Sequence, residues 1–176
     1  MARTFPPSSQ NDSAEFRSLQ PSLLDRLTMD DHRQSIGRAI TPDEFKESLR
    51  RDLEWVFKAR CQPNYEDLER DYPLLASSAM NYGLPTFRDD TLSSLRTGEV
   101  LKRFRKAILR FENRIRPESL RVVVPDDLLS IQRVEGGCVL HVVIEGEAAG
   151  FPETLIFRAQ VNVATGDCSI GDERRA

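Results

Sequence analysis

The chain has 176 residues, of which 39% are hydrophobic and 30% are charged. A chain of this length can hold a hydrophobic core without disulfides or metal ions. No apolar run approaches eighteen residues, which excludes an integral membrane protein, and the hydrophobic content excludes general disorder. With 25 basic and 28 acidic residues the net charge is −3, so overall charge gives no hint of nucleic-acid binding.

The first forty residues contain one short apolar segment. Residues 1–20 are rich in serine, proline and polar residues, which predicts a disordered arm. Residues 21–40 are predicted to be a docking segment and a linker, with Leu24 and Leu27 in one helical turn beside Arg26. A helix this short is marginal in water, so we expect it to dock on its own chain or on a partner.

Thr41-Pro42-Asp43-Glu44 predicts the start of a helix. The threonine can cap, the proline suits the first helical position, and the glutamate completes a capping box. We expect this helix to end near Arg60. Its predicted apolar face is formed by Phe45, Leu49, Leu53 and Val56, widened by Trp55 and Phe57.

A second long helix is predicted from about Thr97. Its apolar residues recur at steps of three and four, at Val100, Leu101, Phe104, Ala107, Ile108 and Phe111. Before it, residues 64–71 predict a short helical turn. Residues 74–78 and 81–85 are expected to be irregular, because glycine and proline interrupt them.

After Pro117 the hydrophobic spacing changes to alternation, which is typical of strands. We expect strands near residues 121–124, 129–131, 138–145, 154–163 and 168–170, with a hairpin turn at 135–137. Helices followed by antiparallel strands predict an α+β fold, with the N-terminal helices packed on a C-terminal antiparallel sheet. A single domain is expected over residues 41–171, followed by a charged tail over 172–176.

Motifs for common catalytic and cofactor chemistry do not occur. The sequence has no phosphate-binding loop, no dinucleotide fingerprint and no zinc-hydrolase motif. Its three cysteines, Cys61, Cys138 and Cys168, form no CxxC pair, which predicts reduced thiols. The first twenty residues lack the apolar stretch of a signal peptide. We therefore expect a cytoplasmic protein with no cofactor, no metal site and no catalytic residue.

Glu112 is the best candidate for a general acid, and it supports the alternative of a peptidoglycan-cleaving enzyme. Cations beside a carboxyl lower its pKa, whereas a general acid at neutral pH needs a raised pKa. Because Arg110 and Arg114 lie nearby in the sequence, an ion pair is favoured over catalysis.

A basic stripe of seven cations accompanies the second helix, at Lys102, Arg103, Arg105, Lys106, Arg110, Arg114 and Arg116. An ordinary solvated helix face is one interpretation. Nucleic-acid binding is a second, although no aromatic residues are interleaved with the cations. A docking face for a protein partner is a third. Composition does not choose among them.

Four segments together resemble TssE, the baseplate subunit of bacterial type VI secretion systems, within the wider phage-tail baseplate wedge family that carries a "lysozyme-like" label. They are PSLLDRL at 21–27, LRRDLEWVFKAR at 49–60, YPLLASSAMNYGLP at 72–85 and FENRI at 111–115. The resemblance implies a small α+β structural subunit at the cytoplasmic face of the inner membrane. The partners that it implies are the TssF–TssG wedge complex and the TssB–TssC sheath, with TssK and the central spike as further candidates.

The family's Glu-Pro-Arg motif matches Glu112, Asn113 and Arg114, with asparagine in place of proline. We expect Asn113 either to form a left-handed cap or to let the helix continue toward Arg116. The resemblance implies that Glu112, Asn113 and Arg114 bind the wedge. Leu24, Arg26 and Leu27 are predicted to bind a partner as well, and the sheet is expected to contact the sheath.

Overall fold

The structure is a computed structural model that describes residues 19, 21–28, 40–62, 65–85, 97–125, 131–134, 137–151, 153–162 and 165–172. Several sequence predictions lie outside these residues. They are most of the N-terminal arm, the linker between residues 29 and 39, part of the hairpin turn at 135–137, and the tail after residue 172.

The chain forms two compact units. The first contains Met1–Ser48 and Gly150–Pro152, and the second contains Leu49–Ala149 and Glu153–Ala176. Helix α4 (Pro42–Lys58) contributes residues to both units. The domain boundaries expected from the sequence stay a prediction.

In the first unit, the N-terminus of α4 has the predicted capping box. The backbone N–H of Thr41 donates to Glu44 Oε2 at 2.8 Å, and the N–H of Glu44 donates to Thr41 Oγ1 at 3.2 Å. Both bonds satisfy N–H groups that the first turn of a helix leaves without partners. This unit also contains the short helix α2 (Leu23–Thr28) and a stacked pair of rings, Phe45 and Phe151, whose centroids lie 5.6 Å apart.

The second unit contains the remaining helices. They are α5 (Tyr65–Asp71), α6 (Pro73–Ala76), the 3₁₀ turn η1 (Ala79–Asn81) and α7 (Thr97–Phe111). The predicted irregular structure after residue 73 is wrong at α6. Proline needs no N–H partner in the first turn of a helix, so Pro73 starts this helix rather than preventing it.

Five strands of the second unit form one antiparallel sheet, which confirms the predicted α+β class. They are β1 (Arg121–Val123), β2 (Ile131–Val134), β3 (Gly137–Gly146), β4 (Leu155–Asn162) and β5 (Cys168–Asp172). The order is β1-β3-β4-β5, and β2 also pairs with β3. Strand β1 pairs with residues 143–145 and β2 with residues 137–140, so both share one edge of β3.

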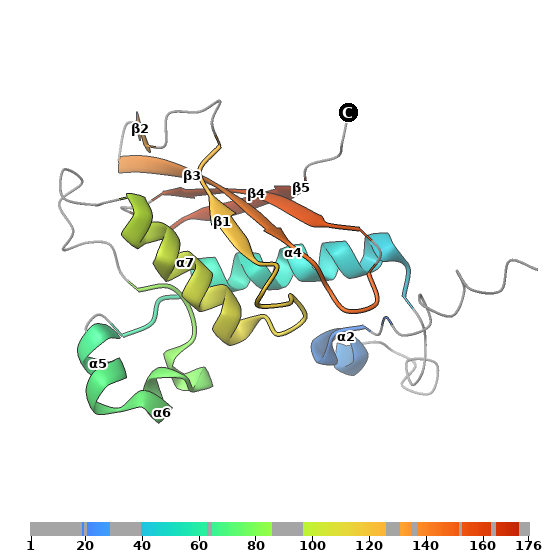
Figure 1. The fold of residues 1–176 in the computed structure, drawn as a ribbon, viewed down its shortest axis with the longest axis horizontal. Coiled ribbons are helices and arrows are strands. Elements are labelled where there is room, and N and C mark those ends of the chain that lie inside the picture. Colours follow the sequence, from blue (N-terminus) through green and yellow to red (C-terminus); the bar gives the residue numbers. More distant parts are fainter. Residues whose placement is uncertain are drawn as a thin grey trace, which may run out of the picture. The chain divides into compact units, whose positions relative to one another are not determined.

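The core of the second unit lies between one face of this sheet and the helices α4 and α7 (Figure 1). Along β4, the residues at positions 155, 157, 159 and 161 are buried, while Arg158 and Gln160 are exposed. Phe57 of α4 and Phe104 of α7 meet edge to face with centroids 4.9 Å apart. Such aromatic pairs add to the stabilisation that burial of their area provides.

Trp55 does not belong to this core, so the predicted widening of the apolar face of α4 is wrong at this residue. Its side chain is exposed, and the guanidinium group of Arg51 lies 5.0 Å from the ring centroid. At 100° per residue, position 55 falls away from the stripe formed by Leu49, Leu53 and Val56. A cation stacked on the ring replaces core packing here.

Gly83 connects the α5–α6 region to the end of α4. Its φ is +117°, and a Cβ built on it would lie 2.4 Å from the carbonyl oxygen of Ala59. The close approach lets Leu84 N–H donate to Ala59 O at 3.0 Å and lets Cys61 N–H donate to Leu84 O at 3.1 Å. Only glycine meets both requirements without strain.

We expect Gly83→Ala to lower the free energy of unfolding by at least about 2 kcal/mol, because it adds a backbone clash to an unfavourable φ. Gly98→Ala is the matched control, since a Cβ at this helical position meets nothing within 4 Å. It should raise stability by about 0.5–1 kcal/mol. Urea unfolding of both variants measures the difference, and equal stabilities would contradict the role of Gly83.

Candidate functional site

The chain leaves α7 at Glu112, whose side chain is buried although the residue is charged. The residue is only 4% exposed, and its N–H still donates to the carbonyl of Ile108 at 2.8 Å. The helix ends at Phe111, and Asn113 has no positive φ. The two conformations predicted for Asn113, a left-handed cap and a helix that continues toward Arg116, are therefore both wrong.

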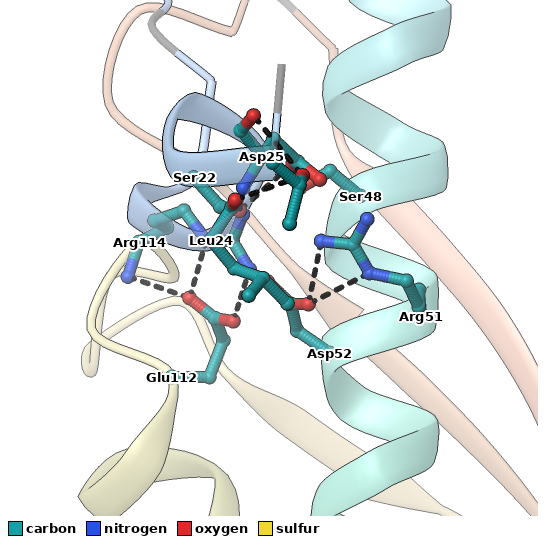
Figure 2. A network of polar contacts seen from close by, with 9 residues as sticks. Ser22, Leu24, Asp25, Ser48, Arg51, Asp52, Glu112 and Arg114 are labelled. Atoms are coloured by element: carbon teal, nitrogen blue, oxygen red, sulfur yellow. Dashed lines mark hydrogen bonds and ion pairs between the residues drawn. The ribbon is translucent and has the colours of Figure 1, made fainter. Parts of the chain in front are cut away.

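The carboxylate of Glu112 closes this turn itself. Arg114 donates to Glu112 Oε1 from its backbone N at 3.0 Å and from Nε at 2.8 Å, and its Nη2 donates to Oε2 at 2.5 Å (Figure 2). Just beyond, Ile115 is buried and forms a bridge with Ala148. The ion pair favoured for Glu112 from the sequence is therefore present. It is buried rather than exposed, because the turn carries Glu112 inward between two buried anchors, Ile108 and Ile115.

Helix α4 supplies the other half of the site. Arg114 Nη2 also donates to Asp52 Oδ2 at 2.6 Å, and Arg51 donates to Asp52 Oδ1 from Nε and Nη2 at 3.1 and 3.0 Å. The four residues Glu112, Arg114, Asp52 and Arg51 thus form a chain of alternating charge, called here the Arg114 network. Charge-assisted bonds of this kind are shorter and stronger than neutral ones.

Sequence reasoning missed Asp52. It lies 62 residues from Arg114 along the chain, so no local spacing connects the two. The signal available was a carboxylate directly before the core residue Leu53, within the segment that already resembled the TssE family.

The pKa values of Arg114 and Tyr82 are both raised, and the carboxylates of Glu112 and Asp52 contribute to both shifts. Burial alone would lower the pKa of Arg114, but the hydrogen bonds that it donates to Glu112 and the charges of Glu112 and Asp52 outweigh this effect, so the pKa is raised. Burial raises the pKa of Tyr82, and the charges of Asp52 and Glu112 raise it further. The ring of Tyr82 packs edge to face on Phe111 with centroids 4.8 Å apart. The charges of Asp52 and Glu112 thus act on a partly buried aromatic side chain.

Both oxygens of Glu112 are committed to Arg114, which bears on the enzyme alternative. A general acid needs an oxygen that can reach the leaving group. The carboxylate here accepts three bonds from one arginine instead. The arrangement is that of a positioning group and disfavours peptidoglycan cleavage.

In the first unit, the predicted docking segment forms α2 and contacts its own chain through Asp25. Ser22 Oγ and Asp25 Oδ2 lie 2.8 Å apart, and the N–H of Asp25 donates to Ser22 Oγ at 3.2 Å, which caps the helix. The hydroxyl of Ser48, on α4, donates to Asp25 Oδ2 at 3.3 Å (Figure 2). Polar contacts therefore orient α2 within this unit.

Two leucines of α2 are exposed. Leu24 is 42% exposed and Leu27 is 63% exposed, while Arg26 is half-buried. Burying apolar surface is the main stabilising term in folding and association. These two side chains therefore contribute little to the fold and remain available to a partner.

Much of the basic stripe is engaged within the chain. Arg105 donates to the carbonyls of Leu120 and Pro117 at 3.4 and 3.2 Å, and Lys106 pairs with Glu69. Arg110 donates to Ala76 O at 2.8 Å. Cations that hold backbone carbonyls are less available to phosphates, which disfavours the nucleic-acid alternative.

The described residues contain neither a cluster of metal ligands nor a membrane-spanning helix. No group of three or more potential metal ligands occurs among them. Within the same residues, no helix has the length and apolar character needed to cross a membrane. Cys61 and Cys168 are buried free thiols, and burial raises the pKa of Cys168 to about 12.

The chain is similar to a known protein family. The family model described as "Baseplate wedge protein gp25" matches residues 43–147. This range includes all four members of the Arg114 network. No curated protein and no solved structure matches the chain.

We expect Arg114→Ala to lower the free energy of unfolding by about 2–4 kcal/mol, because the buried carboxylate of Glu112 loses its counter-charge. Adding Glu112→Gln should restore part of this loss, since no uncompensated charge then stays buried. Urea unfolding of the two single variants and the double variant measures the coupling.

Arg70→Ala is the control for this cycle. Arg70 pairs with Asp67 and Asp71, but all three side chains are largely exposed. Its removal should leave stability nearly unchanged. A coupling near zero between positions 112 and 114 would contradict the structural role of the Arg114 network.

Proposed function

Because the chain belongs to the baseplate wedge protein gp25 family, we propose that it is the TssE-type subunit of a bacterial type VI secretion baseplate. The family's role is structural, in a baseplate. The family match over residues 43–147 carries the proposal. The finer role proposed is non-catalytic: the subunit docks on the TssF–TssG wedge complex and supports assembly of the TssB–TssC sheath, in the cytoplasm at the inner membrane.

The wedge-docking surface is proposed to include the turn after α7. Asn113 is exposed and Arg114 presents about a fifth of its side chain to solvent. Glu112 is too buried to contact a partner directly, so it acts by orienting Arg114. A guanidinium group already held in a fixed plane loses little conformational entropy when a partner binds.

The leucines of α2 are proposed as a second contact with the wedge. Leu24 and Leu27 offer apolar area, and Arg26 lies between them in the sequence. Short amphipathic helices commonly bind by placing such anchors in a partner's groove.

We expect Leu24→Ser and Leu27→Ser each to weaken binding to the purified wedge complex by about 1–2 kcal/mol while changing the melting temperature little. Leu24 and the control residue Val123 on β1 have the same exposed fraction, 42%. Val123→Thr should bind the wedge like the wild type. Biolayer interferometry on the full chain and thermal unfolding provide the two measurements.

Two outcomes would contradict this part of the proposal. A large drop in melting temperature for Leu27→Ser would place the leucine in the core of the free subunit. Clearance of a peptidoglycan suspension that Glu112→Gln abolishes would show catalysis instead of a structural role.

Sheath contact is proposed to use an open edge of the sheet. Strands β1 and β5 lie at the two ends of the strand order. At β5 the carbonyl of Ile170 already accepts a bond from Arg50 Nη1 at 3.1 Å. An edge strand can accept another chain through its backbone groups. The β1 edge is therefore the favoured one.

Hydrogen exchange of the free subunit and of its complex with sheath protein checks this. We expect residues 121–123 to gain protection on binding, and residues 168–172 to change less, because backbone pairing slows exchange. Protection of 168–172 alone would move the contact to β5, and unchanged exchange at both edges would contradict strand pairing.

A further inference from the structure

The segment from the end of α5 to η1 exposes an unusual amount of apolar surface. Leu74 and Met80 are each 86% exposed, and Tyr72 and Leu75 are exposed as well. Single exposed apolar residues are common, but four within nine residues form a patch. Apart from Ala76, which is fully buried, this segment gives little to the core of the second unit.

Buried polar groups hold the segment in place. The carbonyl of Ala76 accepts bonds from Arg110 Nη1 at 2.8 Å and from Asn81 Nδ2 at 3.1 Å. Asn81 is buried and its Oδ1 accepts the backbone N–H of Gln62 at 2.9 Å. An arginine and a buried amide thus fix a segment whose outer side chains have no core role, which is the arrangement of a preorganised binding surface.

The patch borders a groove of about 400 Å³, called here the α5–α6 groove. Its apolar lining includes Leu68, Tyr72, Leu75 and Met80, and Asp67 and Asp71 add carboxylates. A volume of this size accommodates one or two large side chains of a partner.

The charges at the groove are acidic in sum. Arg70 lies 3.0 Å from Asp67 Oδ1 and 2.9 Å from Asp71 Oδ1, so one guanidinium group serves two carboxylates. All three side chains are at least half exposed, and such pairs exchange readily for another cation. The groove therefore offers apolar contact beside acceptors for a positive charge.

We propose that the α5–α6 groove binds a segment of another baseplate protein that presents an apolar side chain with a lysine or arginine beside it. A second copy of this chain is disfavoured, because pairing two grooves would bring two acidic rims together. The inference rests on the proposed assembly role for the source of the partner, but it uses none of the residues proposed for wedge docking.

The first experiment places a photo-crosslinking p-benzoylphenylalanine at position 80 of the full chain in cells that assemble the apparatus. Position 118, an exposed turn residue, is the control. The expected product links position 80 to a peptide of a different protein with lysine or arginine within about four residues of the linked apolar residue. No product above the control, a link to a second copy, or a link to an acidic peptide would overturn the proposal.

The second experiment measures the affinity of the full chain for a synthetic peptide of the linked sequence. Leu75→Ser and Met80→Ser should each weaken binding about tenfold without changing the melting temperature. Arg70→Gln should tighten binding, because it frees both carboxylates for the partner's cation. Tighter binding after Asp67→Asn or Asp71→Asn, or weaker binding after Arg70→Gln, would overturn the charge assignment.

The two proposals fail separately. If Leu27→Ser abolishes wedge binding but the crosslink at position 80 still forms, the result supports the role of α2 and leaves the groove proposal unchanged. An intact wedge interaction with no crosslink at position 80 removes the groove and leaves the docking role standing.

Discussion

A carboxylate cannot be buried in a protein without hydrogen bonds and a counter-charge, and Glu112 meets that condition through a single neighbour. Arg114 supplies both, and its remaining reach connects to Asp52 on α4. The end of α7 and the second half of α4 are thereby fixed to each other by charge as well as by the Phe57–Phe104 contact. The turn that follows then delivers Ile115 to its bridge with Ala148 and the chain to β1.

The basic stripe is a poor guide to function, because several of its cations contact groups of their own chain. A cation on a helix surface can contact solvent, a partner or a group of its own chain. The structure of an isolated subunit contains only the contacts within the chain. Arg105 and Arg110 hold backbone carbonyls. Exposed apolar side chains lie elsewhere, at Leu24 and Leu27 of α2 and beside the α5–α6 groove. A structural subunit of an assembly is expected to combine a firmly held frame with such apolar surface.

Local patterns predicted the elements well, because their causes are local. The capping box at Thr41, the apolar period of α7 and the alternation along β4 each act within a few residues, and the structure confirms them. The α+β class follows from their order.

The Arg114 network could not be predicted, because its members lie far apart in the sequence. From the sequence, Glu112 and Arg114 can be recognised only as a local ion pair. In the structure, Asp52 on another helix completes the cluster. The predictions for Trp55 and for the residues of α6 were wrong for local reasons. Trp55 lies at an angle away from the apolar stripe of α4, and Pro73 starts a short helix in a segment that was expected to be irregular.

The bond from Arg50 to the carbonyl of Ile170 spans 120 residues of chain. Helices α4 and α7 precede strands β4 and β5 in the chain, and buried residues of all four elements form the core. During synthesis the apolar faces of α4 and α7 therefore stay uncovered until β4 and β5 have been made. Contacts between residues this distant in sequence also form slowly. The fold described here is therefore complete only after β4 and β5 have been synthesised. Until then the uncovered apolar faces of α4 and α7 promote aggregation, as exposed apolar surface generally does.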